Sequence, residues 1–436
     1  FDAFPAAATA SVVYLVLAFA FALVRRYTPI PFWVATLLFV PAVFGGVFVG
    51  LEYPLTLIPA GASIPLPTVI SANVSAWLVV LLLYAFAASV LPVWTLLQPR
   101  DYLSSYLLYA GLGGAVLSII VGTLFGTADT SLTMSLDPFT GFMSPAFDGM
   151  GPLLPMLIPT IFCGAVCGLH SMVCCGTTPK QINKETDATA VGYGTTLAEG
   201  LLAVVAIGTV AVIPTVPSGS GINLALPAFA DGGALILTSI GIPAGVGAPF
   251  MALVLSAFAL TTVDTSIRLG RYFLTDMVDA ETAPSRMSRA VTNKYLTGGA
   301  QALLAYLLVA SGSWATVWPL FGASVQVFAG LSMLTVAVWI VNWDASKQVA
   351  GFLLGAGFIL AASLSALLYI ASRNIRTVLD QSWVTSASSV EVASVVIQIL
   401  AVVVLTGIAA EIIRLVYRHV SEQRQASIEL PSPGDD

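Results

Sequence analysis

The chain has 436 residues, of which 58% are hydrophobic and only 9% are charged, and its formal net charge is −6. A soluble protein has about a quarter of its residues charged, so this composition excludes a surface that faces water over most of the molecule. The 16 lysines and arginines are too few and too scattered to form a phosphate-binding face, which excludes nucleic acid as a partner.

Apolar runs recur along the whole chain at about the twenty-residue length that a helix needs to cross a lipid bilayer. They predict an all-α polytopic membrane protein with about eleven transmembrane helices. The predicted spans are residues 6–24, 32–51, 73–97, 104–126, 152–176, 190–213, 246–267, 292–310, 316–341, 347–370 and 390–413.

The basic residues give an independent test of these spans. If the spans alternate in direction, all 16 lysines and arginines except Arg373 and Arg376 fall on one side of the membrane. Cytoplasmic loops carry the excess of Lys and Arg, so we expect that side to be cytoplasmic, with the N-terminus outside and the C-terminus inside. The external connections, which contain no Lys or Arg, are then 52–72, 127–151 and 214–245.

All four cysteines lie close to one of the two histidines. On a continuous helix, Cys163, Cys167, His170 and Cys174 share one face. The outer two are roughly 16 Å apart at 1.5 Å per residue, whereas zinc ligands lie within about 2.3 Å of the metal. We therefore favour buried packing over a metal pair, and expect neither a metal nor a cofactor. A disulfide between Cys174 and Cys175 is disfavoured at a cytoplasmic helix end.

The segment after these cysteines predicts a break in the helix. Gly176 can end the membrane helix, and Thr178-Pro179-Lys180-Gln181 fits a capping box that starts a short helix at residue 179. A well-capped turn explains this pattern. The alternative is that the amides at the new helix start, with Lys180 beside them, attract a carboxylate.

Four long motifs stand out along the chain. They are "CGAVCGLHSMVCCGTTPKQINKETDATAVGYGTTLAEGLLAVVA" (163–206), "SVLPVWTLLQPRDYLSSYL" (89–107), "TTVDTSIRLGRY" (261–272) and "WPLFGASVQVFAG" (318–330). Together they resemble the carbon starvation (CstA) family and cover most of residues 75–345 in family order. The resemblance implies a secondary transporter of the amino-acid/polyamine/organocation superfamily, with broken helices in a LeuT-like core, that takes up pyruvate or small peptides with protons.

The sequence departs from the family pattern in several places. Cys174-Cys175 replaces the usual Ser-Ser, and Val325 replaces an Asn, so a polar contact there is expected to be lost. The family's opening Gly-rich helices with paired histidines have no counterpart, and the chain begins at Phe1. We therefore expect N-terminal helices to be missing and the site to be incomplete.

We expect four segments and no soluble domain. Residues 1–72 hold the first two spans and an external loop, 73–345 the transport core, 346–420 the last spans, and 421–436 a disordered cytoplasmic tail. In the third external loop, the segment 226–243 is expected to hold a short helix on or in the membrane.

Glu199 is the clearest ionisable group inside a predicted span. At 1.5 Å per residue it lies roughly 13 Å from the cytoplasmic end of the span, near the bilayer midplane. Gly192, Thr195, Thr196 and Glu199 form a polar stripe, which we expect to face protein or a water-filled cavity. A carboxyl group there can exchange a proton near neutral pH, so we predict proton coupling by Glu199 with His170 as its partner. A structural glutamate is the alternative.

Asp264 and Arg268 lie four residues apart, in the acid-before-base order that favours an ion pair on a helix. They are interpreted as a gate or as an ion pair at the membrane interface. Thr261 and Thr262 offer hydroxyls to a substrate or a cation. Arg100, in a short cytoplasmic turn, is expected to be structural.

The sequence therefore predicts a transporter of the inner cell membrane and not an enzyme. Its partners are a small-molecule substrate, the lipid bilayer and a coupling ion, expected to be a proton with sodium as the alternative. A membrane-embedded metal or redox enzyme subunit that uses the Cys/His face and a passive channel are the rival functions. The predicted substrate contacts are Thr177, Thr178, Lys180, Thr195, Thr196 and Gln326.

Overall fold

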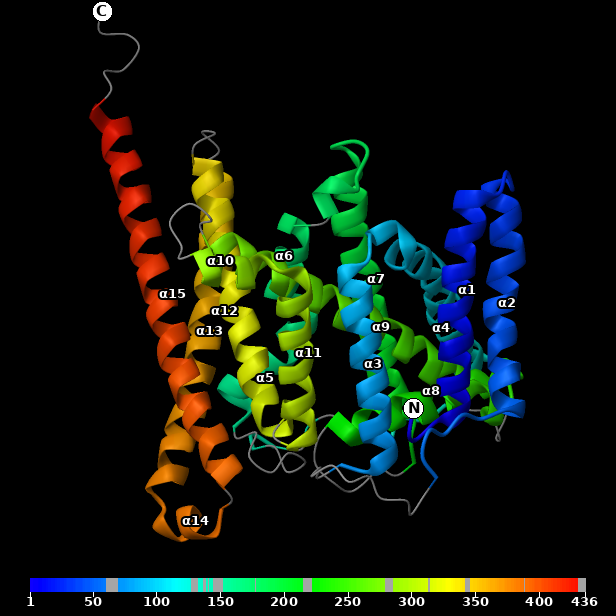
Figure 1. Ribbon diagram of the computed structural model, residues 1–436. Coiled ribbons are helices and arrows are strands. Elements are labelled where there is room, and N and C mark those ends of the chain that lie inside the picture. Colours follow the sequence, from blue (N-terminus) through cyan, green and yellow to red (C-terminus); the bar gives the residue numbers. More distant parts are fainter. Residues whose placement is uncertain are drawn as a thin grey trace, which may run out of the picture. The chain divides into compact units, whose positions relative to one another are not determined.

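In its described part, the computed structural model consists of α-helices and two short 3-10 helices joined by loops, without a strand, so the all-α prediction is confirmed (Figure 1). The core of a bilayer offers no water to backbone N–H and C=O groups. A helix satisfies these groups by hydrogen bonds within its own segment. The residues described are 1–59, 70–126, 132–135, 139, 141–143, 152–176, 178–214, 222–278, 285–312, 314–341, 346–387 and 389–429.

The chain divides into two compact units that interleave in sequence. The first is Phe1–Phe139 with Leu197–Gly312, and the second is Thr140–Thr196 with Ser313–Asp436. The first holds α1 (Pro5–Tyr27), α2 (Phe32–Glu52), α3 (Ala72–Val90), the 3-10 helix η1 (Val93–Thr95), α4 (Leu97–Leu124), α8 (Ile222–Thr238), α9 (Ala244–Met277), α10 (Ser285–Thr292) and α11 (Lys294–Ala310). The second holds α5 (Leu153–Ala165), α6 (Gly168–Gly176), the 3-10 helix η2 (Thr178–Lys180), α12 (Trp314–Val341), α13 (Ser346–Leu379), α14 (Gln381–Ser386) and α15 (Ser389–Glu429), while α7 (Asp187–Ala211) contributes to both.

Nine helices of the described chain are long and apolar enough to cross a membrane, namely α1, α2, α3, α4, α7, α9, α12, α13 and α15. Two of the eleven predicted spans correspond to other elements. The span 152–176 is interrupted after Ala165 and forms the two shorter helices α5 and α6. The span 292–310 is α11, whose 17 residues stand at the lower end of the range for a transmembrane helix.

Small residues allow the helices of the first unit to approach closely. Antiparallel α1 and α2 lie side by side (Figure 1), with the Cα of Gly50 directly over the backbone carbonyl of Ala6. Tyr14, Leu107 and Leu253, all fully buried, fill the space between α1, α4 and α9. Lipid is as apolar as these side chains, so close packing and hydrogen bonds hold such helices together.

The second unit is centred on α12, α13 and α15 (Figure 1). Gly330 of α12 lies against Leu360 of α13, where a Cβ atom would come within 2.6 Å of the leucine Cγ. Buried amides join α13 to α15, since Asn374 donates a 3.1 Å hydrogen bond to Gln398. Such amide pairs contribute to helix association in a membrane.

Two predictions for the connections can be compared with the structure. The segment 226–243 does contain a helix, because α8 covers Ile222–Thr238. The tail prediction needs correction, since α15 continues to Glu429 and so into the segment 421–436. The reason is that Glu, Gln, Arg and Ala in this stretch all favour a helix.

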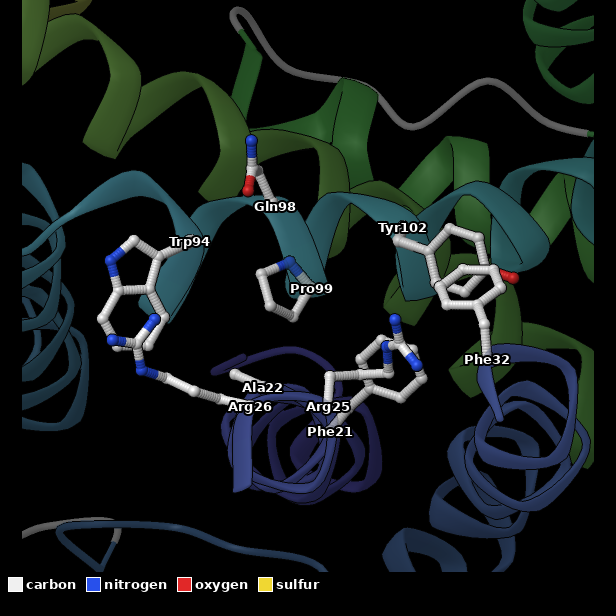
Figure 2. Close-up of a pocket in the computed structure, with 9 residues that line it drawn as sticks. All are labelled: Phe21, Ala22, Arg25, Arg26, Phe32, Trp94, Gln98, Pro99 and Tyr102. Carbon is white, nitrogen blue, oxygen red and sulfur yellow. The ribbon is translucent and has the colours of Figure 1, made fainter. Parts of the chain in front are cut away.

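A cavity of about 380 Å³ lies in the first unit, where α1 ends and α2 and α4 begin (Figure 2). Arg25 and Arg26 of α1 border it on one side, and Trp94 of η1 and Pro99 of α4 on another. Two of its lining residues, Phe21 and Tyr102, stack on each other with ring centres 5.6 Å apart.

Candidate functional site: a buried ion network between α3, α4 and α9

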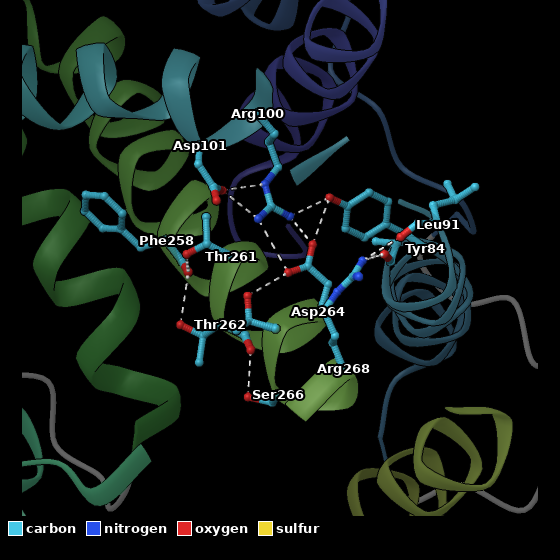
Figure 3. A network of polar contacts seen from close by, with 12 residues as sticks. Tyr84, Leu91, Arg100, Asp101, Phe258, Thr261, Thr262, Asp264, Ser266 and Arg268 are labelled. Atoms are coloured by element: carbon cyan, nitrogen blue, oxygen red, sulfur yellow. Dashed lines mark hydrogen bonds and ion pairs between the residues drawn. The ribbon is translucent and has the colours of Figure 1, made fainter. Parts of the chain in front are cut away.

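Arg100 of α4 is the centre of a polar network in the first unit (Figure 3). Its guanidinium is fully buried and all five N–H donors have acceptors. Nε and Nη2 donate to Asp101 at 3.2 and 2.8 Å. Nη1 donates to the Tyr84 hydroxyl at 2.7 Å and to Asp264, and Nη2 also reaches Asp264 at 3.4 Å. Arg100 is thus shared between two carboxylates.

The two carboxylates differ in their surroundings. Asp264 of α9 is fully buried, whereas the side chain of Asp101 is 52% exposed. The tyrosine hydroxyl also donates to Asp264 at 3.4 Å. An ion pair without access to water is stable only when hydrogen bonds satisfy its remaining donors and acceptors, and Tyr84 supplies such a bond here.

Local sequence places Arg100 inside a helix. Pro99 lies in the first turn of α4, where a missing N–H costs little. From α1, the Tyr14 hydroxyl donates to the backbone carbonyl of Arg100 at 2.7 Å. Tyr84 stands on α3, about 9 Å before the end of that helix at 1.5 Å per residue. The expectation that Arg100 belongs to a short turn is therefore wrong. Helix α4 begins at Leu97, before the apolar run from which the span 104–126 was predicted.

Three basic residues surround the C-terminal end of α3. Arg268 donates to the carbonyls of Ala88 and Leu91 at 2.5 and 2.8 Å, and Arg271 donates to the carbonyl of Ser89. Lys294 reaches the carbonyl of Val90 at 3.5 Å. Helix α3 ends here because Leu91 precedes Pro92 and is extended. The cations satisfy the last carbonyls and the negative end of the helix dipole.

The structure corrects the predicted pairing of Asp264 with Arg268. Asp264 instead pairs with Arg100 on another helix, while Arg268 points to the end of α3 (Figure 3). The hydroxyls of Thr261 and Thr262 donate to the carbonyl of Phe258 on their own helix, at 2.7 and 3.3 Å. They stand beside the network, and their predicted contact with a substrate or cation stays a prediction.

The predicted Cys/His face is divided by a helix break. Because α5 ends at Ala165 and α6 begins at Gly168, Cys163 and Cys167 do not continue the face that His170 and Cys174 share on α6. His170 and Cys174 are exposed and Cys167 is half-buried. The side chains of Cys163 and Cys175 lie outside the described residues. In the described part of the chain, no three His, Cys, Asp or Glu side chains are grouped so that they could hold a metal ion.

Within the second unit, α6 packs tightly on α12. The Cα of Gly168 faces the backbone of Val325 and Ala329, and the hydroxyls of Ser171 and Ser332 share a hydrogen bond of 2.8 Å.

One buried side chain of α12 has no hydrogen-bond partner among the described residues. Gln326 is fully buried, and neither its Nε2 nor its Oε1 has a hydrogen-bond partner among the described residues. Buried amides of proteins are normally hydrogen-bonded, so Gln326 is an exception to that rule, and its predicted substrate contact stays a prediction.

The segment after α6 contains one turn of 3-10 helix in place of the short helix predicted from residue 179. This turn is η2, and the amide of Gln181 donates to the carbonyl of Thr178 at 2.9 Å. The next α-helix starts only at Asp187, whose carboxylate suits a helix N-terminus. The capping pattern therefore closes a turn and does not start a helix. Thr177 and the side chain of Lys180 lie outside the described residues.

The polar stripe of α7 is exposed. All side chains from 188 to 201 are exposed, Glu199 included. Thr196 donates to the carbonyl of Gly192 at 2.9 Å, and Thr195 donates to it at 3.1 Å. Glu199 falls in the first unit and His170 in the second, so their pairing and the coupling role of Glu199 stay predictions.

The helices and the network define a polytopic α-helical membrane protein with an ion pair buried between its spans. The family described as carbon starvation protein CstA matches residues 1–223 and 221–366, so the chain belongs to the CstA family. No solved structure matches, and the LeuT-like arrangement stays a prediction.

Curated relatives agree with this assignment. A peptide transporter CstA of Helicobacter pylori is 28% identical over 398 residues, which are 79% of this chain and 55% of that protein. The peptide transporter CstA of Campylobacter jejuni is 30% identical over 66% of this chain and 47% of its own length. The pyruvate/proton symporter BtsT of Escherichia coli is 27% identical over 61% of this chain and 46% of its own length. The chain spans about half the length of these relatives.

Proposed function

We propose that the protein is a secondary active transporter that imports a small carboxylate, either pyruvate or a short peptide, together with a proton by alternating access. The observation that carries the proposal is the fully buried Arg100–Asp264 pair between three helices that are each long enough to span a membrane. Ionisable groups at such positions are costly and mark transport pathways by default. The names of the relatives support both cargo classes.

The bonding of Arg100 suggests how a proton and an anion are coupled. All five of its donors are occupied. A cargo carboxylate can therefore bind to Arg100 only after one of the present acceptors has moved away. Protonation of Asp264 weakens its bond to the guanidinium and frees donors that fit a carboxylate. The proton and the anion then bind together, as symport requires. The ion pair also links α4 to α9. Breaking it would release the two helices from each other, as the opening of a gate requires.

Glu199 is retained as a second candidate for proton coupling. It lies on α7 in a predicted span and carries an exposed carboxylate. We also propose that the membrane face carrying most of the basic residues is cytoplasmic, which places the C-terminus inside the cell.

Uptake by proteoliposomes tests this function. The protein, expressed from its complete gene, is reconstituted and offered labelled pyruvate or a labelled dipeptide under an imposed proton gradient, and then under a sodium gradient. We expect proton-driven accumulation of one cargo. Uptake that equilibrates and ignores both gradients would indicate a channel, and a stoichiometric metal in the purified protein would favour the enzyme.

Three variants separate the coupling residues. Asp264→Asn mimics the protonated acid, and we expect it to bind and equilibrate cargo without accumulating it. Glu199→Gln should likewise abolish proton-driven accumulation if Glu199 carries the proton, with folding intact. Glu411→Gln, which neutralises an exposed carboxylate of α15, serves as the control. Unchanged accumulation in both Asp264→Asn and Glu199→Gln contradicts proton coupling through either acid.

A further inference from the structure

The cavity at the end of α1 carries two positive charges and no negative one. Arg25 and Arg26 both border it, and its other lining residues are uncharged. In the described part of the chain, neither guanidinium pairs with a carboxylate. Arg25 donates to the backbone carbonyl of Ile30 at 3.3 Å. Two exposed arginines thus share a hollow of about 380 Å³ whose lining contains no acidic side chain.

Aromatic rings hold both guanidiniums in place (Figure 2). The guanidinium carbon of Arg26 lies 4.1 Å from the centre of a Trp94 ring, and that of Arg25 lies 5.0 Å from the centre of the Phe32 ring. A ring contacts the flat face of a guanidinium. The N–H groups along the edge remain available to a further acceptor, and their fork fits phosphate or carboxylate oxygens.

A simpler explanation accounts for part of this arrangement. Cations in the last turn of α1 offset the helix dipole, and long basic side chains extend to the membrane surface. Either role is satisfied by a freely moving lysine. Neither the offset of the helix dipole nor the extension to the membrane surface requires two arginines held by aromatic rings around one hollow. The volume of this hollow is typical of small-molecule sites.

We propose that this cavity binds a phosphate-bearing anion at the membrane surface. Helices α1 and α2 each have the length and composition of a span, so the turn between Tyr27 and Phe32 lies where lipid headgroups are found. Anionic headgroups bind basic pockets between helices at such surfaces, and the apolar lining residues Phe21 and Ala22 suit the start of the acyl chains of a lipid. The same chemistry fits free phosphate.

An occupant would touch the helix turn that carries the ion network. Pro99 lines the cavity, and the next residue in α4 is Arg100. An anion bound here would therefore stabilise the start of α4 in the arrangement that holds the Arg100–Asp264 pair.

Lipid titration of the detergent-solubilised full-length protein tests the proposal. Phosphatidylglycerol, phosphatidylcholine and inorganic phosphate are added separately, and binding is followed by native mass spectrometry and by the melting temperature. We expect phosphatidylglycerol to bind and to raise the melting temperature more than phosphatidylcholine does. In Arg25→Gln/Arg26→Gln its affinity should fall at least about tenfold, because charge-assisted hydrogen bonds are lost.

Control variants keep the test decisive. Arg376→Gln/Arg414→Gln removes two charges from exposed positions of α13 and α15 and should bind like the wild type. Arg25→Lys/Arg26→Lys keeps both charges but lacks the forked N–H groups of arginine, and we expect it to bind phosphatidylglycerol more weakly than the wild type. This variant replaces Arg25→Gln/Arg26→Gln if the glutamine variant does not fold. Protection by inorganic phosphate alone identifies a free anion as the ligand. Equal affinity in the wild type and the Arg25/Arg26 variants, or no preference over phosphatidylcholine, overturns the proposal.

Discussion

Arg100 of α4 and Asp264 of α9 form an ion pair in which both side chains are fully buried. The residues are far apart in sequence, and Tyr84 of α3 bonds to both. A buried ion pair is a poor source of net stability, since apolar replacement of both partners is often neutral. Its position between spanning helices is therefore the main structural reason to assign it a role in transport.

A double-mutant cycle on this pair is the first prediction. Arg100→Gln alone should lower the free energy of unfolding by about 3–5 kcal/mol, because it leaves the buried Asp264 carboxylate without its partner. Asp264→Asn alone should cost less, because Arg100 keeps its ion pair with Asp101. The double variant should lose clearly less than the sum of the two. Unfolding in mixed micelles measures these changes. Arg414→Gln, in an exposed pair with Glu411, should cost about 0–1 kcal/mol. Additive losses in the cycle would contradict a direct interaction.

The end of α3 supports a second prediction. Arg268→Gln removes hydrogen bonds to the carbonyls of Ala88 and Leu91, and we expect a loss of about 1–3 kcal/mol in the same unfolding assay. Arg376→Gln changes an exposed arginine at the end of α13 and should alter stability by less than about 0.5 kcal/mol. An equal effect of the two substitutions would show that Arg268 does not stabilise α3.

Much of the fold was predictable because a bilayer imposes a length and an apolar composition on each crossing helix. Glu199 and Gln326 both lie on such helices, as expected. The break at 166–167 was not predicted, since Val166 and Cys167 are as apolar as their neighbours and only the packing of Gly168 on α12 reveals it.

The ion network was only half predictable. Asp264 drew attention as an acid inside a span, but its partner lies on a helix far away in sequence, and local spacing favoured Arg268. Pro99 was the available signal, because proline in a first turn indicates that a helix has already begun. With that reading Arg100 becomes a second charge inside a span, and the two opposite charges suggest each other. Tyr84 left no comparable signal, because a tyrosine in an apolar helix is ordinary.

The third prediction concerns pH and a short helix outside the spans. Asp380 precedes α14 and accepts hydrogen bonds from the Ser382 hydroxyl at 2.6 Å and from its amide at 3.0 Å. These bonds hold the pKa of Asp380 below its usual range. Its stabilisation of α14 is therefore complete above the ordinary pKa of about 3.9 and is lost as the pH falls through the lowered value.

Amide hydrogen exchange of α14, corrected for intrinsic rates, measures this effect. Protection should fall on acidification in the wild type. Asp380→Asn retains a side-chain acceptor without a titrating group, so its protection should change little with pH over the same range. Identical pH profiles for the two proteins would exclude Asp380 as the cause.

The fourth prediction uses two glycines on either side of the helix break. In Gly168→Ala the new methyl group would meet the amide nitrogen of Ala329 at 2.7 Å and the Cβ of Phe328 at 2.8 Å, so α6 must move away from α12. We expect a loss of about 1–3 kcal/mol in unfolding free energy and reduced uptake. Gly164→Ala is the matched control, because no atom of the described residues lies within 4 Å of its added methyl group, and alanine favours a helix by up to about 1 kcal/mol. If both variants unfold and transport alike, the close approach of α6 to α12 does not constrain the protein.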